Sequence, residues 1–415
     1  MFFHPMHALF VFVLFSLCSL IPAQDYFPPP DSQGGWRTLT DAGRIQKLAG
    51  IDVKRLDQAF EYTQRTTKHG GLLVVRHGYL VYEKYFGRGN HDANPDNYSV
   101  TKAITSIAVG IMLEQKKDQI PEGLETKIFT QKYLPEAFPF SDPRKANITL
   151  GQLLSFTSGI QDSPVLHPPG ASTAASGPDD LYRTASSDEN ALRFPLWTDP
   201  GAGWRYSTLA THLAGMMVRK LTGMELEEYV NERLAKPMGW GRWGYVKHLS
   251  DGGTLLHTPG GTGIAVRPTD ALRFAYLLLH KGRWGGRQLV PADYIEIATH
   301  PSPYNPYTPY SLQLEVNADG HVVGAPHDAF FKSGSGGYAV YAIPSLDMAI
   351  YKMGGSDLAY DSARTGLPML YRYDGSRDNW QPHPPGVFWD GPIDTDVGIR
   401  RLLEMVVASV ATCAP

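Results

Sequence analysis

Apolar residues recur at helical spacing in several parts of the chain. In residues 52–67, Val53, Leu56, Ala59 and Phe60 fall on one face, so this stretch is expected to form an amphipathic helix that ends near Gly70. The same spacing, with glycine or proline near the ends, predicts three helices in the middle of the chain and one near its end, at residues 209–221, 226–234, 269–280 and 396–411.

Other stretches alternate with a period of two and are rich in β-forming residues, which indicates strands. Residues 72–75 and 80–85 are separated by a short segment that contains Gly78, a pattern typical of a β-hairpin. Further strands are expected at 330–331, 338–343 and 348–353, and a Pro344-Ser345 turn links the last two into a second hairpin.

The run at residues 103–113 is apolar on nearly every side. This pattern predicts a buried helix, capped by Asp96 or Asn97. A short helix is expected after Ile148, followed by a long polar loop at 161–190. We assign no role to the aromatic and proline-rich passage 371–392.

Strands near both ends with helices between them predict one domain of the α/β (α+β) class. Its sheet is built from both terminal parts, is flanked by helices and is interrupted by an inserted region. We expect an extended lead-in at 24–51, the sheet domain at 52–98 and 310–415, and a mostly helical region at 99–309. A ligand pocket is expected where the two parts meet.

Residues 1–23 have the pattern of a secretory signal peptide. An apolar run from Ala8 to Ile21 precedes the small residue Ala23, near which cleavage is expected. The run is shorter than the ~20 apolar residues of a membrane anchor, so we favour a secreted or periplasmic protein with no stable membrane insertion after signal removal. A retained anchor is the alternative.

Charge and cysteine content narrow the range of partners. The 38 basic and 41 acidic residues form no long run of like charge, which argues against nucleic acid and favours a small, weakly charged molecule. Of the two cysteines, Cys18 lies in the signal and Cys413 remains, so no intramolecular disulfide is expected.

The first candidate for chemistry is Ser99 with Lys102 at the start of the apolar run. Positions i and i+3 of a helix share a face, so the hydroxyl and the amine can meet. A buried lysine can act as the base that activates a serine, because burial disfavours its charged form. The spacing also occurs by chance and needs support from other residues.

Two further stretches carry reactive side chains. A Pro-Gly turn at 200–201 delivers Tyr206 just before a predicted helix, and Lys332 on a predicted strand is followed by small residues. Taken alone, Tyr206 can be a half-buried core residue and Lys332 a charge on an edge strand.

Together, Ser-x-x-Lys at 99–102, Tyr206 and Lys332-Ser333-Gly334 resemble the three sequence elements of the serine β-lactamase and penicillin-binding-protein superfamily. The chain is most similar to its class C and family VIII carboxylesterase branch, over about residues 52–355. This resemblance implies a β-lactamase/transpeptidase-like fold.

The resemblance also implies roles for single residues. Ser99 becomes acylated, and Lys102 and Tyr206 share its proton. The backbone N–H groups of Ser99 and Ser335 bind the oxyanion, and Lys332 orients a substrate carboxylate or polarises Tyr206. Ser333 and Gly334 belong to the same substrate-binding strand, and neither a metal nor an organic cofactor is required.

Thr208 stands where penicillin-recognising members usually have asparagine, two residues after the tyrosine. It lacks the amide that holds a substrate amide, so we expect a carboxylesterase-type enzyme acting on a small-molecule ester, amide or peptide. A β-lactamase or a D-alanyl-D-alanine carboxypeptidase-type peptidase is the alternative within the superfamily, and a non-catalytic binding protein is the alternative of another class.

Motifs of other enzyme classes are missing from the sequence. The chain has no Gly-x-Ser-x-Gly and no His-Glu-x-x-His among its 14 histidines. The sequence therefore gives no support to an α/β-hydrolase or a zinc peptidase.

Overall fold

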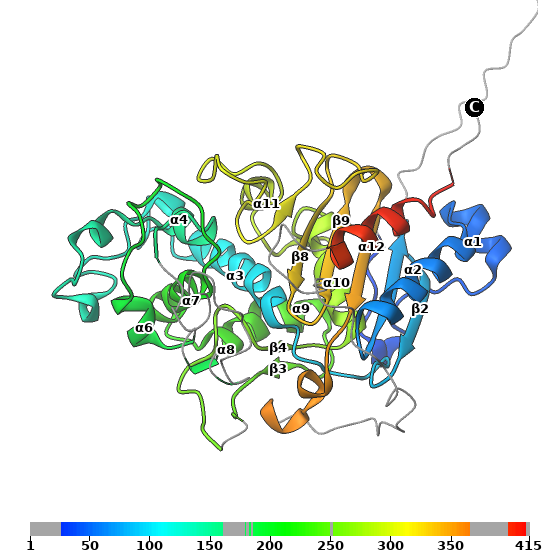
Figure 1. Ribbon diagram of the computed structural model, residues 1–415, viewed down its shortest axis with the longest axis horizontal. Coiled ribbons are helices and arrows are strands. Elements are labelled where there is room, and N and C mark those ends of the chain that lie inside the picture. The colour runs from blue at the N-terminus through cyan, green and yellow to red at the C-terminus, as the bar shows by residue number, and fades with distance from the viewer. Residues whose placement is uncertain are drawn as a thin grey trace, which may run out of the picture.

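The computed structural model describes residues 26–160, 179, 182–183, 186–249, 252–365 and 397–411. Its centre is a six-stranded antiparallel sheet in the order β2-β1-β10-β9-β8-β7 (Figure 1). The strands are β1 (Gly70–Arg76), β2 (Tyr79–Phe86), β7 (Glu315–Val316), β8 (Phe330–Gly334), β9 (Tyr338–Ile343) and β10 (Met348–Met353).

Both predicted hairpins are confirmed. The first turns through His77 and Gly78, which have positive φ angles of 50° and 71°, as a tight two-residue turn between twisted strands requires. Strand β1 then pairs with β10, so that Leu73 lies opposite Tyr351. The sheet is thus built from both terminal parts of the chain, as the sequence predicted.

The sheet is covered on both faces, which explains why β1 is apolar at almost every position. Leu72 and Val74 pack in one core cluster with residues of α2 (Val53–Thr66) and α12 (Val397–Val407). Leu73 and Val75 point to the other face, into the larger cluster that includes α10 (Pro268–Leu279). Alternating side chains of one strand therefore serve two cores.

A helical region lies beside the sheet, and the predicted buried helix α3 (Thr101–Gln115) runs through it (Figure 1). Its residues 101–112 are all buried, and α7 (Thr208–Thr222) packs against it. Further α-helices among the described residues are α4 (Leu150–Leu154), α6 (Asp188–Arg193), α8 (Leu226–Val230), α9 (Lys236–Met238) and α11 (Ala292–Thr299). A π-helical turn at Asn231–Ala235 joins α8 to α9, and two small sheets pair β3 (Gly244–Tyr245) with β4 (Ile264–Ala265) and β5 (Arg283–Trp284) with β6 (Arg287–Gln288).

The structure differs from the sequence prediction at two places. Residues 24–51 were expected to be an extended lead-in, but α1 (Ala42–Ala49) forms there, and the ring of Phe27 packs on Tyr276 of α10 at 6.0 Å between centroids. Helix α10 itself falls in the predicted helical region, yet it packs against β9 and β10. Both differences have the same cause. The periodicity of a sequence shows that a helix or strand has an apolar face, but it does not show which segment of the chain packs on that face.

Some expectations fall on parts of the chain outside the described residues. These are the signal at 1–23, most of the polar stretch 161–190 and the passage 371–392. The last three residues of the polar stretch belong to α6. Among the residues that the structure describes, no helix has the length and apolar character that crossing a membrane requires.

Gly110 offers a test of how tightly α3 is packed. A Cβ atom there would lie 2.5 Å from the ring of Tyr294, which is held by hydrogen bonds between its hydroxyl and Ser106. We therefore expect Gly110→Ala to lower the free energy of unfolding by about 2 kcal/mol, measured by urea denaturation. Gly43→Ala, in exposed α1 where the nearest atom would be 3.4 Å away, is the control and should be neutral or stabilising by up to about 1 kcal/mol. Equal effects of the two changes would contradict close packing at Gly110.

Candidate active site

Ser99 lies in a single 3-10 turn, Tyr98–Val100, that leads directly into α3. The residue before it, Tyr98, has a positive φ of 46°, which is unusual for a residue with a bulky side chain. The predicted cap is wrong, because α3 begins after Val100 and no side chain caps it. Asp96 Oδ1 accepts from the Tyr98 N–H at 2.8 Å, within the turn that precedes the helix. The Asn97 amide instead accepts from the Tyr351 hydroxyl at 2.6 Å.

The predicted contact between Ser99 and Lys102 is present. Lys102 Nζ lies 3.0 Å from Ser99 Oγ and donates to the Gly261 carbonyl at 2.6 Å. Lys102 has an exposed fraction of 0%, so water does not stabilise its charge. A neutral amine that keeps an N–H on Gly261 can direct its lone pair to Ser99.

The loop that receives Lys102 is held against α3 and α7. Thr105 Oγ1 donates to the Gly260 carbonyl at 2.5 Å. A Cβ atom on Gly261 would lie 2.6 Å from the Thr208 methyl, so only glycine fits there without movement. The structure thus places Thr208, a predicted substrate contact, in a buried position beside the loop that binds Lys102; its exposed fraction is 5%.

Tyr206 and Lys332 come together from distant parts of the chain. Lys332 Nζ donates to the Tyr206 hydroxyl at 3.1 Å. The Nζ atoms of Lys102 and Lys332 each lie 4.9 Å from the centre of the Tyr206 ring. The phenol is therefore placed between two amines, where a negative charge on its oxygen would be stabilised.

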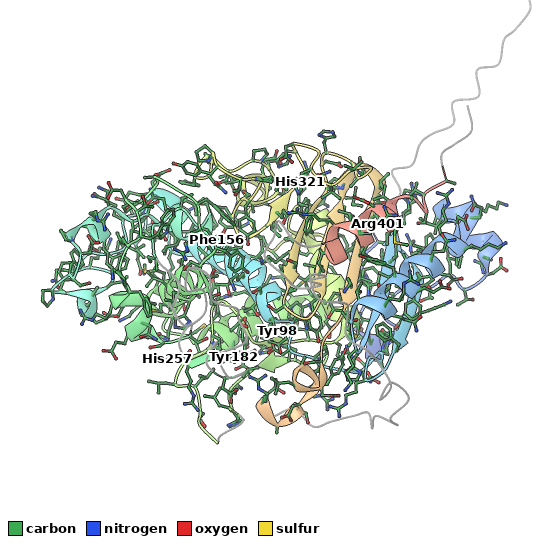
Figure 2. The ribbon with its side chains drawn as sticks, in the orientation of Figure 1. Tyr98, Phe156, Tyr182, His257, His321 and Arg401 are labelled. Atoms are coloured by element: carbon green, nitrogen blue, oxygen red, sulfur yellow. The ribbon has the colours of Figure 1, made fainter. Side chains whose placement is uncertain are left out.

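Aromatic residues that the sequence did not single out form one wall beside Tyr206. Phe156 lies 4.6 Å from the Tyr206 ring, and Tyr310 stacks on Phe156 at 5.1 Å; Figure 2 labels Phe156. Burial raises the pKa of Tyr310 well above its ordinary value, so this phenol stays neutral beside Lys332. Phe156 follows a short helix in the sequence, but its positive φ of 63° and its neighbours are visible only in the structure.

The end of β8 reaches the turn that carries Ser99. A Cβ atom on Gly334 would lie 2.2 Å from the Asn97 carbonyl oxygen and 3.2 Å from the Ser99 nitrogen, so glycine permits this approach. Ser333 is half-buried on β8, and Ser335 is exposed in the turn that follows. Within the described residues, neither the Ser99 N–H nor the Ser335 N–H has an acceptor, which leaves both available to an oxyanion.

A second layer of polar residues supports the Gly260 loop. His212 Nδ1 accepts from the Gly260 N–H at 3.1 Å, and Nε2 lies 3.0 Å from Asp188 Oδ1. Arg219 also pairs with Asp188. Burial raises the pKa of Asp188, but the hydrogen bonds from His212 and Arg219 outweigh it and lower the pKa to about 2. No sequence pattern marks the His212–Asp188 pair, since a lone histidine in an apolar helix is usually a core residue.

The described residues contain no group of three or more His, Cys, Asp or Glu side chains arranged to hold a metal ion. The polar atoms at the site are instead a hydroxyl, two amines, a phenol and backbone N–H groups. Such groups support nucleophilic attack and proton transfer.

This fold, in which Ser99, Lys102, Tyr206 and Lys332 lie together, is that of the serine β-lactamase and penicillin-binding-protein superfamily. The chain belongs to the Beta-lactamase family, whose model matches residues 56–354.

Proteins similar to this chain carry different names. The chain is 31% identical over 208 residues to Esterase EstB of Burkholderia gladioli, covering 46% of this chain and 51% of the relative. It is 28% identical over 204 residues to Lovastatin esterase of Penicillium rubens, covering 44% and 51%. The chain thus spans about half the length of these curated relatives. The solved structure of EstCE1, a hydrolase with promiscuous acyltransferase activity, is similar in fold with a TM-score of 0.59 and 16% identity, covering 87% of this chain and 98% of that one.

The Asp188 pair makes a testable contribution to stability. The pKa of Asp188 is about 2, below the ordinary 3.8. Its carboxylate therefore adds to the free energy of unfolding above about pH 4, and this contribution is lost as the pH falls through 2. We expect Asp188→Asn to cost about 2 kcal/mol at pH 7 and to flatten the dependence of unfolding free energy on pH between 4 and 2. Asp118→Asn, at an exposed carboxylate, is the control and should leave the curve unchanged. An Asp188→Asn curve parallel to the wild-type curve would contradict this assignment.

Proposed function

We propose that this protein is a serine hydrolase that cleaves carboxylic esters through an acyl-enzyme on Ser99. The observation that carries the proposal is the 3.0 Å contact between Ser99 Oγ and the fully buried amine of Lys102. A serine hydroxyl is a weak nucleophile without an adjacent base, and the Lys102 amine is placed to be that base.

The reaction follows from the positions of these groups. Ser99 Oγ attacks the acyl carbon while its proton passes to Lys102 or Tyr206, and the carbonyl oxygen becomes an oxyanion held by the N–H groups of Ser99 and Ser335. The bond to the leaving alkoxide then breaks, and the alkoxide takes the proton. Water attacks the acyl-enzyme by the same route in reverse, releasing the acid and restoring Ser99.

Lys332 supports this proton transfer by stabilising negative charge on Tyr206, to which it donates at 3.1 Å. Its Nζ is nearly buried, so the interaction is weakly screened by water. This role is the one of its two predicted roles that the contact favours.

Two observations favour an ester over a β-lactam or peptide. Thr208 has no carboxamide and is buried beside Gly261, where penicillin-recognising relatives usually have asparagine. Two of the similar proteins carry the name esterase. We also propose export of the protein, on the strength of the apolar run at residues 8–21.

Ser99→Ala tests the nucleophile. We expect the variant to lower kcat/KM for a short-chain p-nitrophenyl ester by at least about 10⁴-fold, because it removes the hydroxyl that lies 3.0 Å from the Lys102 amine. Ser32→Ala, at an exposed serine, should keep wild-type activity. A parallel assay with a penicillin should show much slower turnover; hydrolysis of the penicillin in preference to the ester would replace the esterase proposal with a β-lactamase. Full activity of Ser99→Ala would refute both.

Lys332→Met tests the pairing with Tyr206. Removing the positive charge disfavours the phenolate, so kcat/KM should fall by about 10²-fold and the rising limb of its pH profile should move to higher pH. Lys332→Arg keeps the charge and should restore part of the rate. A uniform loss of rate with an unmoved pH profile would show that Lys332 acts on substrate binding instead.

A further inference from the structure

Behind the turn that carries Ser99 lies a buried polar cluster, which we call the Asp96 cluster: Asp96, Asp179, Tyr182 and Arg364. Their exposed fractions are 2%, 7%, 0% and 2%. No step of the hydrolysis uses these residues. Buried charges are costly unless they are paired, so a cluster of this kind needs an explanation.

Asp96 is the centre of the cluster. One carboxylate oxygen accepts from the Tyr98 N–H at 2.8 Å, and the other accepts from the Tyr182 hydroxyl. Arg364 Nη1 lies 4.0 Å from the second oxygen. Figure 2 labels Tyr98 and Tyr182 near the start of α3. The carboxylate therefore joins the residue before the nucleophile to two other segments of the chain.

Arg364 holds the cluster together by charge. Its Nη2 donates to Asp179 Oδ1 at 3.1 Å, and its guanidinium lies 4.7 Å from the centre of the Tyr182 ring. Burial raises the pKa of Asp96, while the Tyr182 hydrogen bond, the Arg364 charge and the Tyr98 N–H lower it. The partners thus oppose the cost of burying a carboxylate.

The backbone conformation of Tyr98 explains why the Asp96 cluster is needed. Its φ of 46° is unfavourable for a tyrosine, and this conformation persists only where the surroundings hold it. Adjacent contacts fix the same stretch: the Asp96 N–H donates to the Ala359 carbonyl at 2.8 Å, and the Asn97 N–H donates to the Ile264 carbonyl at 2.8 Å. The strained residue directly precedes Ser99, so its conformation sets the direction of the Ser99 N–H and side chain.

We propose that Asp96 is a positioning residue that holds Tyr98 in its strained conformation, and that Tyr182 and Arg364 in turn hold Asp96. The cluster keeps Ser99 Oγ on Lys102 and keeps the Ser99 N–H directed to the oxyanion. It acts on the chemical step and not on substrate affinity, since none of its members is exposed. This inference rests on the proposed function of Ser99.

The test uses the full chain with graded variants. Tyr182→Phe removes one hydroxyl and keeps the ring, Asp96→Asn keeps an oxygen that can accept from the Tyr98 N–H, and Asp96→Ala removes it. For each, kcat and KM for the p-nitrophenyl ester, the rate of fluorophosphonate labelling and the melting temperature are measured. We expect kcat and the labelling rate to fall about 10-fold in Tyr182→Phe and at least about 100-fold in Asp96→Ala, with KM within about twofold and Asp96→Asn between the two.

Tyr229→Phe is the matched control. Tyr229 is as buried as Tyr182, and its hydroxyl donates to Gln115 at 2.8 Å, away from the Ser99 turn. The Tyr229→Phe variant should lower the melting temperature by about as much as Tyr182→Phe does, and it should leave kcat and the labelling rate at wild-type values. Wild-type labelling rates in Tyr182→Phe and Asp96→Asn, with only a lower melting temperature, would overturn the proposal and leave the cluster a structural one.

A structural readout separates this proposal from the proposed function. If the wild-type protein neither hydrolyses esters nor reacts with a fluorophosphonate, the hydrolase assignment fails. Crystal structures of the wild-type protein, Asp96→Asn and Tyr182→Phe then test the cluster by the φ of Tyr98. Relaxation to a negative φ in either variant supports the holding role, and an unchanged φ in both contradicts it.

Discussion

The contact between the Ser99 hydroxyl and the buried Lys102 amine is the interaction on which the rest of the site depends. An amine in this position can accept the serine proton only in its neutral form, and burial of the side chain disfavours the charged form. Burial in turn requires α3 to be packed on all sides and the Gly261 carbonyl to accept one N–H of the amine. The reactivity of Ser99 therefore depends on the packing of the core in the helical region.

Three structural parts meet at this pair. The turn before α3 supplies Ser99, the segment that precedes α7 supplies Tyr206, and β8 supplies Lys332 and, at its end, Gly334, which lets the strand approach. The strand that bears Lys332, β8, pairs with β7 and β9, and β9 continues the sheet to β10 and β1. The site thus lies at the junction of the sheet and the helical region, and neither part contains it alone.

Local features of the sequence predicted much of this arrangement. The spacing of Ser99 and Lys102 fixes their contact, because three residues along a helical turn share a face, and both hairpins follow from alternation with turn residues between. Local patterns do not predict contacts between residues that are far apart in the sequence. The hydrogen bond from Lys332 to Tyr206 spans 126 positions and was expected only through family resemblance, and nothing in the sequence marks Asp96 and Tyr182 as partners. The covering of the sheet by α10 was missed for the same reason, since an amphipathic pattern shows that a face is buried and not what buries it.

The most direct test of the central claim is peptide mapping by mass spectrometry after the protein has reacted with a fluorophosphonate. The account predicts one adduct, on the peptide that contains Ser99, and a much slower reaction when Lys102 is replaced by methionine, because the amine that activates the hydroxyl is then missing. An adduct on a different serine, or labelling of Ser99 at an unchanged rate in Lys102→Met, would contradict it.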